Sequence, residues 1–293
     1  MNTTVRPVIV GIGELLWDML PSGKRAGGAP INFVYNATQL GAEGYAISAV
    51  GKDALGDEIL EELGKSGIKG IIERNDFPTG IVEVVLKDGI PSYTIVEGTA
   101  WDHINLSKEA EEIVSKADAV CFGTLALRNS HSAQTIKKLL KCAPNDSFKL
   151  FDINLRGNFY SAELIDELLR ISNIFKINDD EIKIVKKLFF QTGNDEDICR
   201  FLIKKYNLKY LIFTAGENYS IIYTPDEKSY LPTPKVQVCD TVGAGDSFSA
   251  AFIYSLLRGK SLTQAHEFAV KTSAFVCTRA GAWPKYEKGG QNE

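Results

Sequence analysis

Short apolar runs alternate with longer amphipathic stretches along almost the whole chain, and this rhythm constrains the fold more than any other feature. The apolar runs predict buried strands at 8–13, 45–50, 119–123, 149–154, 174–178 and 211–216, with a strand pair at 220–223 and 228–231. The amphipathic stretches predict helices at 29–40, 53–65, 107–116, 130–141, 164–171, 244–257 and 262–277. We therefore expect an α/β fold with a doubly wound, mostly parallel central sheet flanked by helices. Its ligands should bind at the carboxyl ends of the strands.

One segment interrupts this rhythm. Residues 81–86 and 92–96 have the composition of strands, and Asp88-Gly89 between them is a turn signal, so a β-hairpin is expected. We interpret the hairpin as a small antiparallel excursion that acts as a lid or an interface. An isolated two-stranded excursion is marginal in water, so pairing with its copy in a homodimer is expected.

The composition is that of an ordinary globular protein, with 44% hydrophobic and 24% charged residues. The formal net charge of −4 gives no reason to expect nucleic acid or an anionic membrane as a partner. We expect no signal peptide and no membrane span, because no apolar run approaches the roughly 20 residues that a bilayer requires. The five scattered cysteines lack metal-site spacing and predict reduced thiols in a cytoplasmic protein.

The stretch 240–248, Asp-Thr-Val-Gly-Ala-Gly-Asp-Ser-Phe, predicts a loop that turns into a helix. Its small residues Gly243, Ala244 and Gly245 let backbone N–H groups converge, and the helix dipole adds partial positive charge, so an anion site is expected. Asp246 would repel the anion unless it takes a proton from a hydroxyl that attacks a phosphate. The alternative is a plain helix start with an acidic residue in its first turn.

Four motifs occur together in order: Gly-Gly-Ala-Pro-Ile-Asn at 27–32, Asp152-x-Asn154-x-Arg156, Asn178-x-x-Glu181, and the stretch 240–248. Over nearly its whole length the chain resembles the ribokinase-like (PfkB-type) sugar kinases. Gly13-Glu14 followed by Asp18, the Gly-Gly-Ala-Pro form and residues 122–127 are most similar to fructokinases. The resemblance implies one kinase domain over 1–293 with a β lid formed by about 14–28 and 77–100.

The resemblance also implies roles for individual residues. Asp246 matches the catalytic base, and Gly243, Ala244 and Gly245 match the anion hole. The positions that match sugar contacts are Asp18, Gly28 and Asn32, with Arg156 near the sugar and phosphate end. The positions that match the nucleotide end are Asn178 and Glu181, near the phosphates and the magnesium water shell, and Thr214 and Gly216 in the nucleotide loop. A monovalent cation such as K⁺ would be held by backbone carbonyls of Asp240, Val242, Val276, Arg279 and Gly281. The chain departs from the family at Tyr219, where the nucleotide loop usually has glycine.

Several of these residues also have purely structural interpretations. Asp18 and Asn32 could be exposed polar residues, and Arg156 could simply pair with Asp152. Asn178 and Glu181 could cap the next helix, because Asn-x-x-Glu resembles a capping box. Trp17 and Trp101 could stack on a sugar or merely fill the hinge.

The sequence thus predicts an ATP- and Mg²⁺-dependent sugar kinase that phosphorylates a primary hydroxyl, foremost O6 of fructose to give fructose 6-phosphate. Ribose, 2-keto-3-deoxygluconate or a nucleoside are alternative acceptors, and an acid sugar would need a cation such as Arg156. A catalytically silent sugar or nucleotide sensor is a third hypothesis. A silent protein would not need to keep Asp246 and both glycines of the anion hole.

Overall fold

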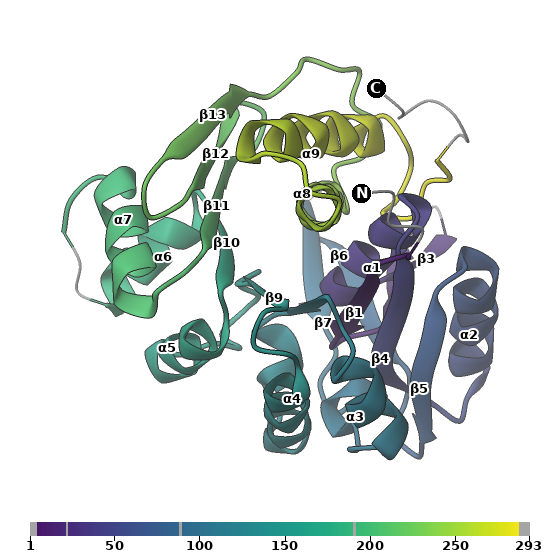
Figure 1. Cartoon of the computed structure of the whole chain (residues 1–293). Coiled ribbons are helices and arrows are strands. Elements are labelled where there is room, and N and C mark those ends of the chain that lie inside the picture. Colours follow the sequence, from purple (N-terminus) through teal and green to yellow (C-terminus); the bar gives the residue numbers. More distant parts are fainter. Residues whose placement is uncertain (1–4, 22, 88–89, 190–191, 287–293) are drawn as a thin grey trace.

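The chain folds around a large, mostly parallel sheet (Figure 1), seen in a computed structural model that describes residues 5–21, 23–87, 90–189 and 192–286. Its strands are β1 (Val8–Ile12), β4 (Glu43–Gly51), β5 (Lys69–Asn75), β8 (Ala119–Phe122), β9 (Phe148–Asp152), β10 (Ile174–Asn178), β11 (Tyr210–Ala215), β12 (Tyr219–Tyr223) and β13 (Lys228–Pro232). They lie in the order β13-β12-β11-β10-β9-β8-β1-β4-β5, and all pairs are parallel except β11–β12 and β12–β13. The predicted doubly wound sheet is confirmed.

The order of the strands reverses at β1. From β1 the chain continues to β4 and β5 on one side, and it later returns to place β8 on the other side. A crevice for ligands opens at the carboxyl ends of the strands where such a reversal occurs. The fold therefore directs the loops after β1, β8, β9, β10 and β11 toward one edge of the sheet.

Helices cover both faces of the sheet. Consecutive residues of a strand point to opposite faces, so both sets of side chains are apolar. Ile9 of β1 packs into the cluster on one face and Val10 into the cluster on the other, and both are fully buried. The first face is covered by α1 (Ala29–Gln39), α2 (Ala54–Ser66), α8 (Ala244–Leu257) and α9 (Leu262–Cys277). The second face is covered by α3 (Lys108–Val114), α4 (Ser130–Cys142), α5 (Ala162–Ile171), α6 (Glu181–Leu188) and α7 (Asp195–Tyr206). In the described ranges, none of the helices combines the length and apolar character that crossing a membrane demands.

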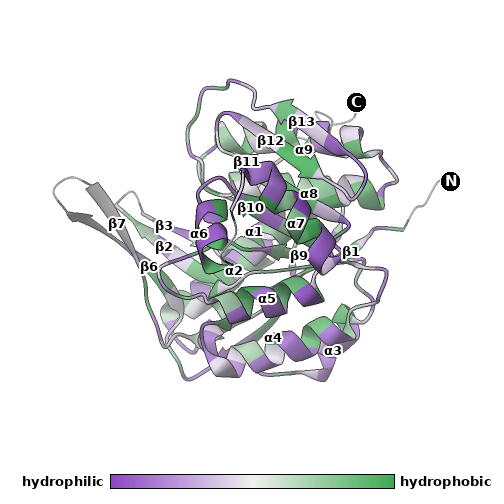
Figure 2. Cartoon of the chain, turned by 90° about the vertical axis from the view of Figure 1, so that its left-hand side faces the viewer, coloured by the Kyte–Doolittle hydropathy of each residue, from purple (hydrophilic) through white to green (hydrophobic). Residues whose placement is uncertain are grey.

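A second, small sheet projects from one side of the molecule (Figure 2) and has the strand order β3-β2-β6-β7. Its strands are β2 (Leu16–Leu20), β3 (Gly23–Gly27), β6 (Gly80–Lys87) and β7 (Ile90–Ile95). The pairs β2–β3 and β6–β7 are antiparallel, whereas β2–β6 is parallel. The hairpin is thus joined to β2 of its own chain and is not isolated. The predicted turn at Asp88-Gly89 lies outside the described residues.

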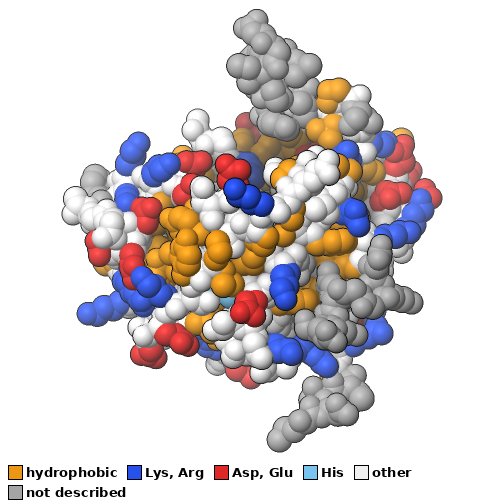
Figure 3. All heavy atoms as spheres, turned by 90° about the horizontal axis from the view of Figure 1, so that it is seen from above, with side chains coloured by type: hydrophobic (Ala, Val, Ile, Leu, Met, Phe, Trp, Pro, Cys, Tyr) orange, Lys and Arg blue, Asp and Glu red, His pale blue; other side chains and the backbone are white. Residues whose placement is uncertain are grey.

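Exposed apolar side chains follow one another from β13 along the connection to α8. They are Tyr230 on β13 and then Val236, Val238 and Val242 on the connection. Figure 3 views the molecule from the side on which this connection runs, above α9. The connection therefore places an apolar rim next to the start of α8.

Candidate active site

The start of α8 forms the predicted anion site. Gly243 is the N-cap residue with φ 78°, a left-handed conformation that glycine adopts without strain. The amide of Ala244 donates to the carbonyl oxygen of Thr241 at 3.2 Å, so this N–H is already engaged. The amides of Gly245 and Asp246 have no acceptor among the described residues, as is usual in the first turn of a helix. The anion site therefore consists mainly of these two N–H groups and the helix dipole.

Asp246 lies in this first turn with a half-buried side chain. Its Oδ2 accepts a hydrogen bond from Nδ2 of Asn32 at 2.9 Å, while its Oδ1 has no partner among the described residues. Burial and, after it, the charge of Asp152 raise the pKa of Asp246, and Lys176, Asn32 and Arg156 act to lower it, so that the pKa lies at about 6. A carboxylate with a free oxygen and a pKa near 6 is suited to accept a proton at neutral pH.

A buried ion pair lies directly beneath the anion site. Nζ of Lys176 on β10 is 2.7 Å from Oδ2 of Asp152 on β9, and the two side chains are 11% and 7% exposed. A Cβ atom at Gly245 would lie 3.0 Å from Nζ of Lys176, so the ammonium is next to the backbone that binds the anion. Burial acts to lower the pKa of Lys176, but Asp152, Glu181 and Asp246 together raise it, and the lysine stays charged.

This pair corrects one alternative interpretation, because Asp152 is bound by Lys176 and Arg156 is not its partner. Arg156 is exposed, and within the described part of the chain its guanidinium donates only to the carbonyl oxygen of Leu155, at 2.9 Å. Sequence reasoning did not single out Lys176, although a lysine within the apolar strand Ile-Phe-Lys-Ile-Asn was a visible signal.

Asp18 lies on β2 and Arg156 on the loop after β9. Asp18 is half-buried, and burial raises its pKa, which the charges of Arg156 and Arg25 act to lower. A Cβ atom at Gly27 would lie 2.7 Å from Oδ2 of Asp18, so the first glycine of the Gly-Gly-Ala-Pro motif leaves room for this carboxylate. Asn154 has φ 37°, a left-handed conformation that turns the loop toward Arg156.

The second glycine of the motif, Gly28, has φ 115°, and a Cβ atom there would lie 2.0 Å from the carbonyl oxygen of Glu14. This approach brings α1 against the loop after β1. Oε1 of Glu14 accepts from the amide of Ala29 at 3.1 Å, whereas Oε2 is buried without a partner among the described residues. Burial raises the pKa of Glu14 to about 7, and the charge of Asp246 contributes. Sequence reasoning used Glu14 only as a marker of resemblance, because burial cannot be read from the motif.

At the other end of the site, Asn178 and Glu181 bind each other as a capping arrangement. Oδ1 of Asn178 accepts from the amide of Glu181 at 2.8 Å, and Oε2 of Glu181 accepts from the amide of Asn178 at 3.0 Å. Oε1 of Glu181 also accepts from the amide of Leu155 at 2.9 Å. The capping interpretation of this motif is therefore present in the structure. It also fixes the loop that carries Arg156.

The nucleotide loop predicted at Thr214 and Gly216 is a tight turn between β11 and β12. Thr214 is the register partner of Asn178, so the two lie on neighbouring strand ends. Gly216 has φ 51°, whereas Tyr219 has no positive φ and pairs with Ala215 at the start of β12. The backbone therefore favours glycine at 216 and has no need of it at 219.

The segments predicted to hold a monovalent cation are joined by the side chain of Asp240. Its Oδ1 accepts from the amide of Val242 and its Oδ2 from the amide of Gly281, each at 3.0 Å. The carbonyl oxygen of Val276 accepts from the amide of Arg279 at 2.9 Å. Oδ2 of Asp240 is also 2.7 Å from Nη1 of Arg25 on β3, which places a protein cation beside these segments.

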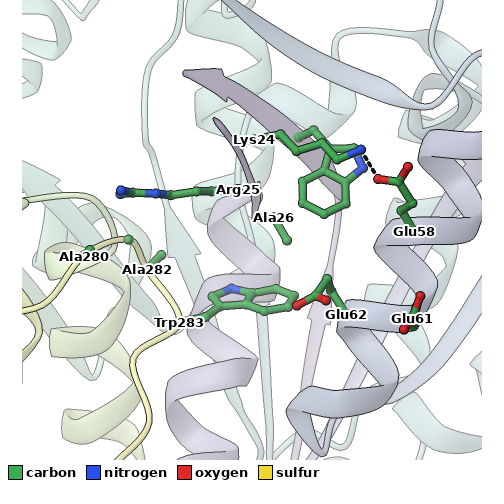
Figure 4. Close-up of a pocket in the computed structure, with 11 residues that line it drawn as sticks. Lys24, Arg25, Ala26, Glu58, Glu61, Glu62, Ala280, Ala282 and Trp283 are labelled. Atoms are coloured by element: carbon green, nitrogen blue, oxygen red, sulfur yellow. Dashed lines mark ion pairs between the residues drawn. The ribbon is translucent and has the colours of Figure 1, made fainter. Parts of the chain in front are cut away.

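A cavity of about 540 Å³ separates the small sheet from α2 and the segment 280–283 (Figure 4). Lys24 pairs with Glu58 at its rim, and its Nζ lies 5.0 Å from the centre of the Trp17 ring. Trp17 is 4% exposed and lines this cavity. Trp101 is fully buried under the guanidinium of Arg128, 4.0 Å away, so it is a packing residue.

The carboxyl edge of the large sheet, the start of α8 and the small sheet together are arranged as in the ribokinase-like fold. The sequence pattern described as "pfkB family carbohydrate kinase" matches residues 22–288. The chain belongs to this family of carbohydrate kinases.

Individual relatives are similar over nearly the full length. An uncharacterized sugar kinase of Pyrococcus horikoshii is 29% identical over 297 residues, which cover 94% of this chain and 92% of that protein. Its crystal structure superimposes with a TM-score of 0.81 over 94% of this chain and 93% of the other. A fructokinase of Rhizobium leguminosarum is 28% identical over 88% of this chain and 82% of its own length. The fructokinase of Xylella fastidiosa, solved with bound ATP, has a TM-score of 0.81 at 20% identity over 95% and 94% of the two chains and shares the fold.

Proposed function

We propose that the protein transfers the γ-phosphoryl group of ATP to a primary hydroxyl of a sugar, and that fructose, giving fructose 6-phosphate, is the principal acceptor. The observation that carries this proposal is the free Oδ1 of Asp246 beside the amides that begin α8, above the ammonium of Lys176. The proton acceptor matches what the attacking hydroxyl requires, and the adjacent anion site matches what the attacked phosphate requires.

In this mechanism Oδ1 of Asp246 accepts the hydroxyl proton as the oxygen attacks the γ-phosphorus. The amides of Gly245 and Asp246 donate to the transferring phosphoryl group, and Gly243 and Ala244 shape the turn that holds them. Lys176 adds a fixed positive charge from below that needs no rearrangement during the reaction. Losing one preorganised donor at such a site costs on the order of 10²–10³ in rate.

The nucleotide is assigned to the end of the site formed by Asn178, Glu181, Thr214 and Gly216. Both carboxylate oxygens of Glu181 already accept backbone N–H groups, and each keeps a second lone pair. This donor set fits contact with Mg²⁺ through its water shell. When bound there, the ion would neutralise negative charge on the phosphates.

The sugar is assigned to Asp18, Gly28, Asn32 and Arg156, with the small sheet as a lid that excludes water. A half-buried carboxylate such as Asp18 accepts two hydrogen bonds from neighbouring hydroxyls. Asn32 is 5% exposed and its amide is already bonded on both sides, so it has one N–H left for a hydroxyl.

One other acceptor class is favoured by a specific observation. The exposed guanidinium of Arg156 has no carboxylate partner among the described residues, and it lies close enough to Asp18 to affect its pKa. Such a group would pair with the carboxylate of an acid sugar such as 2-keto-3-deoxygluconate.

The test is a panel of sugars with ATP and Mg²⁺, in which ADP release and the mass of the product are measured. We expect fructose to stimulate ADP release and to gain one phosphoryl group, while ribose and nucleosides have little effect. Absence of stimulation by fructose removes the principal acceptor. If only the acid sugar is phosphorylated and Arg156→Met abolishes its use, the second acceptor class replaces it.

Two further assignments belong to this proposal. Carbonyl groups of Asp240, Val242, Val276, Arg279 and Gly281 are candidates to bind K⁺, since carbonyl oxygens suit a hard cation. The chain forms a homodimer through the small sheet, whose outer strands β3 and β7 each have one edge without a partner in the described structure.

A further inference from the structure

The segment 282–286 is bound along α1 by a series of polar contacts. These are Ala282 O with Asn36 Nδ2 at 3.3 Å, Trp283 Nε1 with Asn32 Oδ1 at 2.8 Å, Pro284 O with Tyr35 Oη at 3.0 Å, and Tyr286 Oη with Asn36 Oδ1 at 2.6 Å. All four contacts fall on Asn32, Tyr35 and Asn36, which lie within little more than one turn of α1. One of them reaches the catalytic carboxylate through a single side chain.

That side chain is Asn32, which lies between Trp283 and Asp246. Its Oδ1 accepts from the indole N–H, and its Nδ2 donates to Oδ2 of Asp246 at 2.9 Å. An indole nitrogen is only a donor, so the amide oxygen must face Trp283 and the NH₂ group must face Asp246. The two neighbours thus fix an amide orientation that is otherwise ambiguous.

We propose that Trp283 is a positioning residue for the phosphoryl transfer, because its indole N–H holds Asn32 in the one orientation that binds and aims Asp246. This inference rests on the proposed function of Asp246 as the base. With Oδ2 occupied by Asn32, the carboxylate presents Oδ1 to the hydroxyl.

Without the indole N–H, the amide of Asn32 can turn over and place its oxygen against the carboxylate. The bond from Asn32 acts to lower the pKa of Asp246, against the effects of burial and of Asp152. The reversed amide would therefore raise that pKa. The other ionisable groups that face Asp246 stay in place: Glu14, Cys121, Asp152, Arg156 and Lys176.

Trp283 is itself held rigidly. Its ring stacks on that of Tyr35 at 5.2 Å with an interplanar angle of 4°. Its other side borders the cavity beside the small sheet, where Figure 4 shows it below Arg25 and Ala26. A Cβ atom placed on Gly243 would lie 2.6 Å from Cβ of the preceding residue, Ala282. The same segment therefore also lies against the N-cap residue of α8.

The test is Trp283→Phe, which keeps a ring on Tyr35 and removes the N–H. We expect kcat to fall about 5–10-fold, as for one lost hydrogen bond, with the KM for ATP changed less than about twofold. The acid limb of the pH profile should move up by roughly half to one pH unit. The matched control is Tyr35→Phe, which removes the bond to Pro284 and leaves Trp283 bonded to Asn32, so its pH profile should match wild type.

A second measurement does not depend on the substrate. The carboxyl of Asp246 is titrated by ¹³C NMR in wild type and in Trp283→Phe, and a higher pKa is expected in the variant. If the variant does not fold, replacing Trp283 with β-(3-benzothienyl)alanine, which has the same shape without the N–H, serves instead. Unchanged kcat and an unchanged pKa overturn the inference. Failure of every sugar in the panel would instead overturn the proposed function, and the titration would still decide the role of Trp283.

Discussion

In the proposed mechanism Asp246 must meet two demands that usually oppose each other. It must stay ionised near neutral pH to accept a proton, yet it stands at the anion site where negative charge will gather. The structure reconciles them with Lys176 and Asn32, which act against the effect of burial on its pKa. The sequence predicted Asp246 and its glycines as a candidate site, because a glycine-rich helix start with a carboxylate is a local pattern. Lys176 and Glu14 could not be assigned, since their importance comes from burial and from strands that are distant in sequence.

Replacing the base tests this residue directly. Asp246→Asn should bind ATP as wild type does but lose roughly 10²–10⁴-fold in kcat, the range expected for a missing general base. Steady-state kinetics and titration calorimetry with ATP measure the two effects. Turnover close to wild type would remove Asp246 from the mechanism.

The charge of Lys176 should be visible in the pH dependence. The base works only when ionised, so kcat/KM should fall below a pH of about 6, the value to which burial raises the pKa of Asp246. Lys176→Met removes a charge that lowers this pKa, and the acid limb should move to higher pH. Because it leaves Asp152 buried and unpaired, the variant should also lose roughly 3–5 kcal/mol of stability.

The control is the double variant Asp152→Asn/Lys176→Met. It removes both charges, whose effects on Asp246 oppose each other, so its acid limb should lie close to that of wild type. An acid limb that is the same in the single variant, the double variant and wild type would contradict the role given to the ion pair.

Among the elements, those with local signals were predicted best. The limits predicted for the last two helices coincide with α8 and α9, and Asp53 and Ser107 cap α2 and α3 as serine and aspartate commonly do. The strand β5 was not predicted, because its sequence Lys-Gly-Ile-Ile-Glu-Arg-Asn has neither an apolar run nor alternation. It is an edge strand, where charged residues are common and one side needs no partner. The helices α6 and α7 were also missed, although Asn194 and Asp197 form a capping box at the start of α7.

His266 joins α9 to the antiparallel edge of the large sheet and should make stability depend on pH. Its two ring nitrogens are each 2.8 Å from a serine hydroxyl, Ser220 on β12 and Ser229 on β13. Burial lowers its pKa from 6.5 to about 4. Between these values the unfolded chain binds the proton and the folded chain does not, so acid favours unfolding by up to about 1.4 kcal/mol per pH unit.

Thermal melting between pH 7.5 and 4.5 measures this effect. In His266→Gln the side chain carries no charge at either pH, so the fall in melting temperature below pH 6.5 should be smaller than in wild type. His131→Gln is the matched control, since His131 is exposed and no comparable change is expected. Equal slopes for wild type and His266→Gln would mean that the imidazole is not kept neutral.

At the scale of the whole molecule, the site is assembled from parts that the sequence keeps far apart. The motifs predicted which strand ends would meet, because parallel strands bring their carboxyl ends to one edge. They could not predict that Trp283 would bind Asn32, 251 residues away, or that Arg25 of the small sheet would pair with Asp240 beside α8. Such contacts depend on how the small sheet and the C-terminal segment pack, and local sequence patterns do not encode that.

The proposed homodimer is a further property of the whole molecule, and its physical basis differs from the one that the sequence offered. The hairpin is supported by β2 within its own chain, so self-association is not needed to stabilise an isolated pair of strands. The basis for the proposed dimer is instead that the outer edges of the small sheet have no partner among the described residues, and that the side chain of Met19 on β2 is 36% exposed. Unpaired edges of this kind readily join a second copy.

Sedimentation velocity at micromolar concentration should therefore give a dimer for wild type. Met19→Asp places a charge on the small sheet and should shift the equilibrium toward monomer. Val236→Asp is the matched control, because Val236 is equally exposed but lies on the connection from β13 to α8. A wild-type protein that sediments only as a monomer would refute the dimer. A dimer that only Val236→Asp weakens would place the interface on the apolar rim beside α8 instead of on the small sheet.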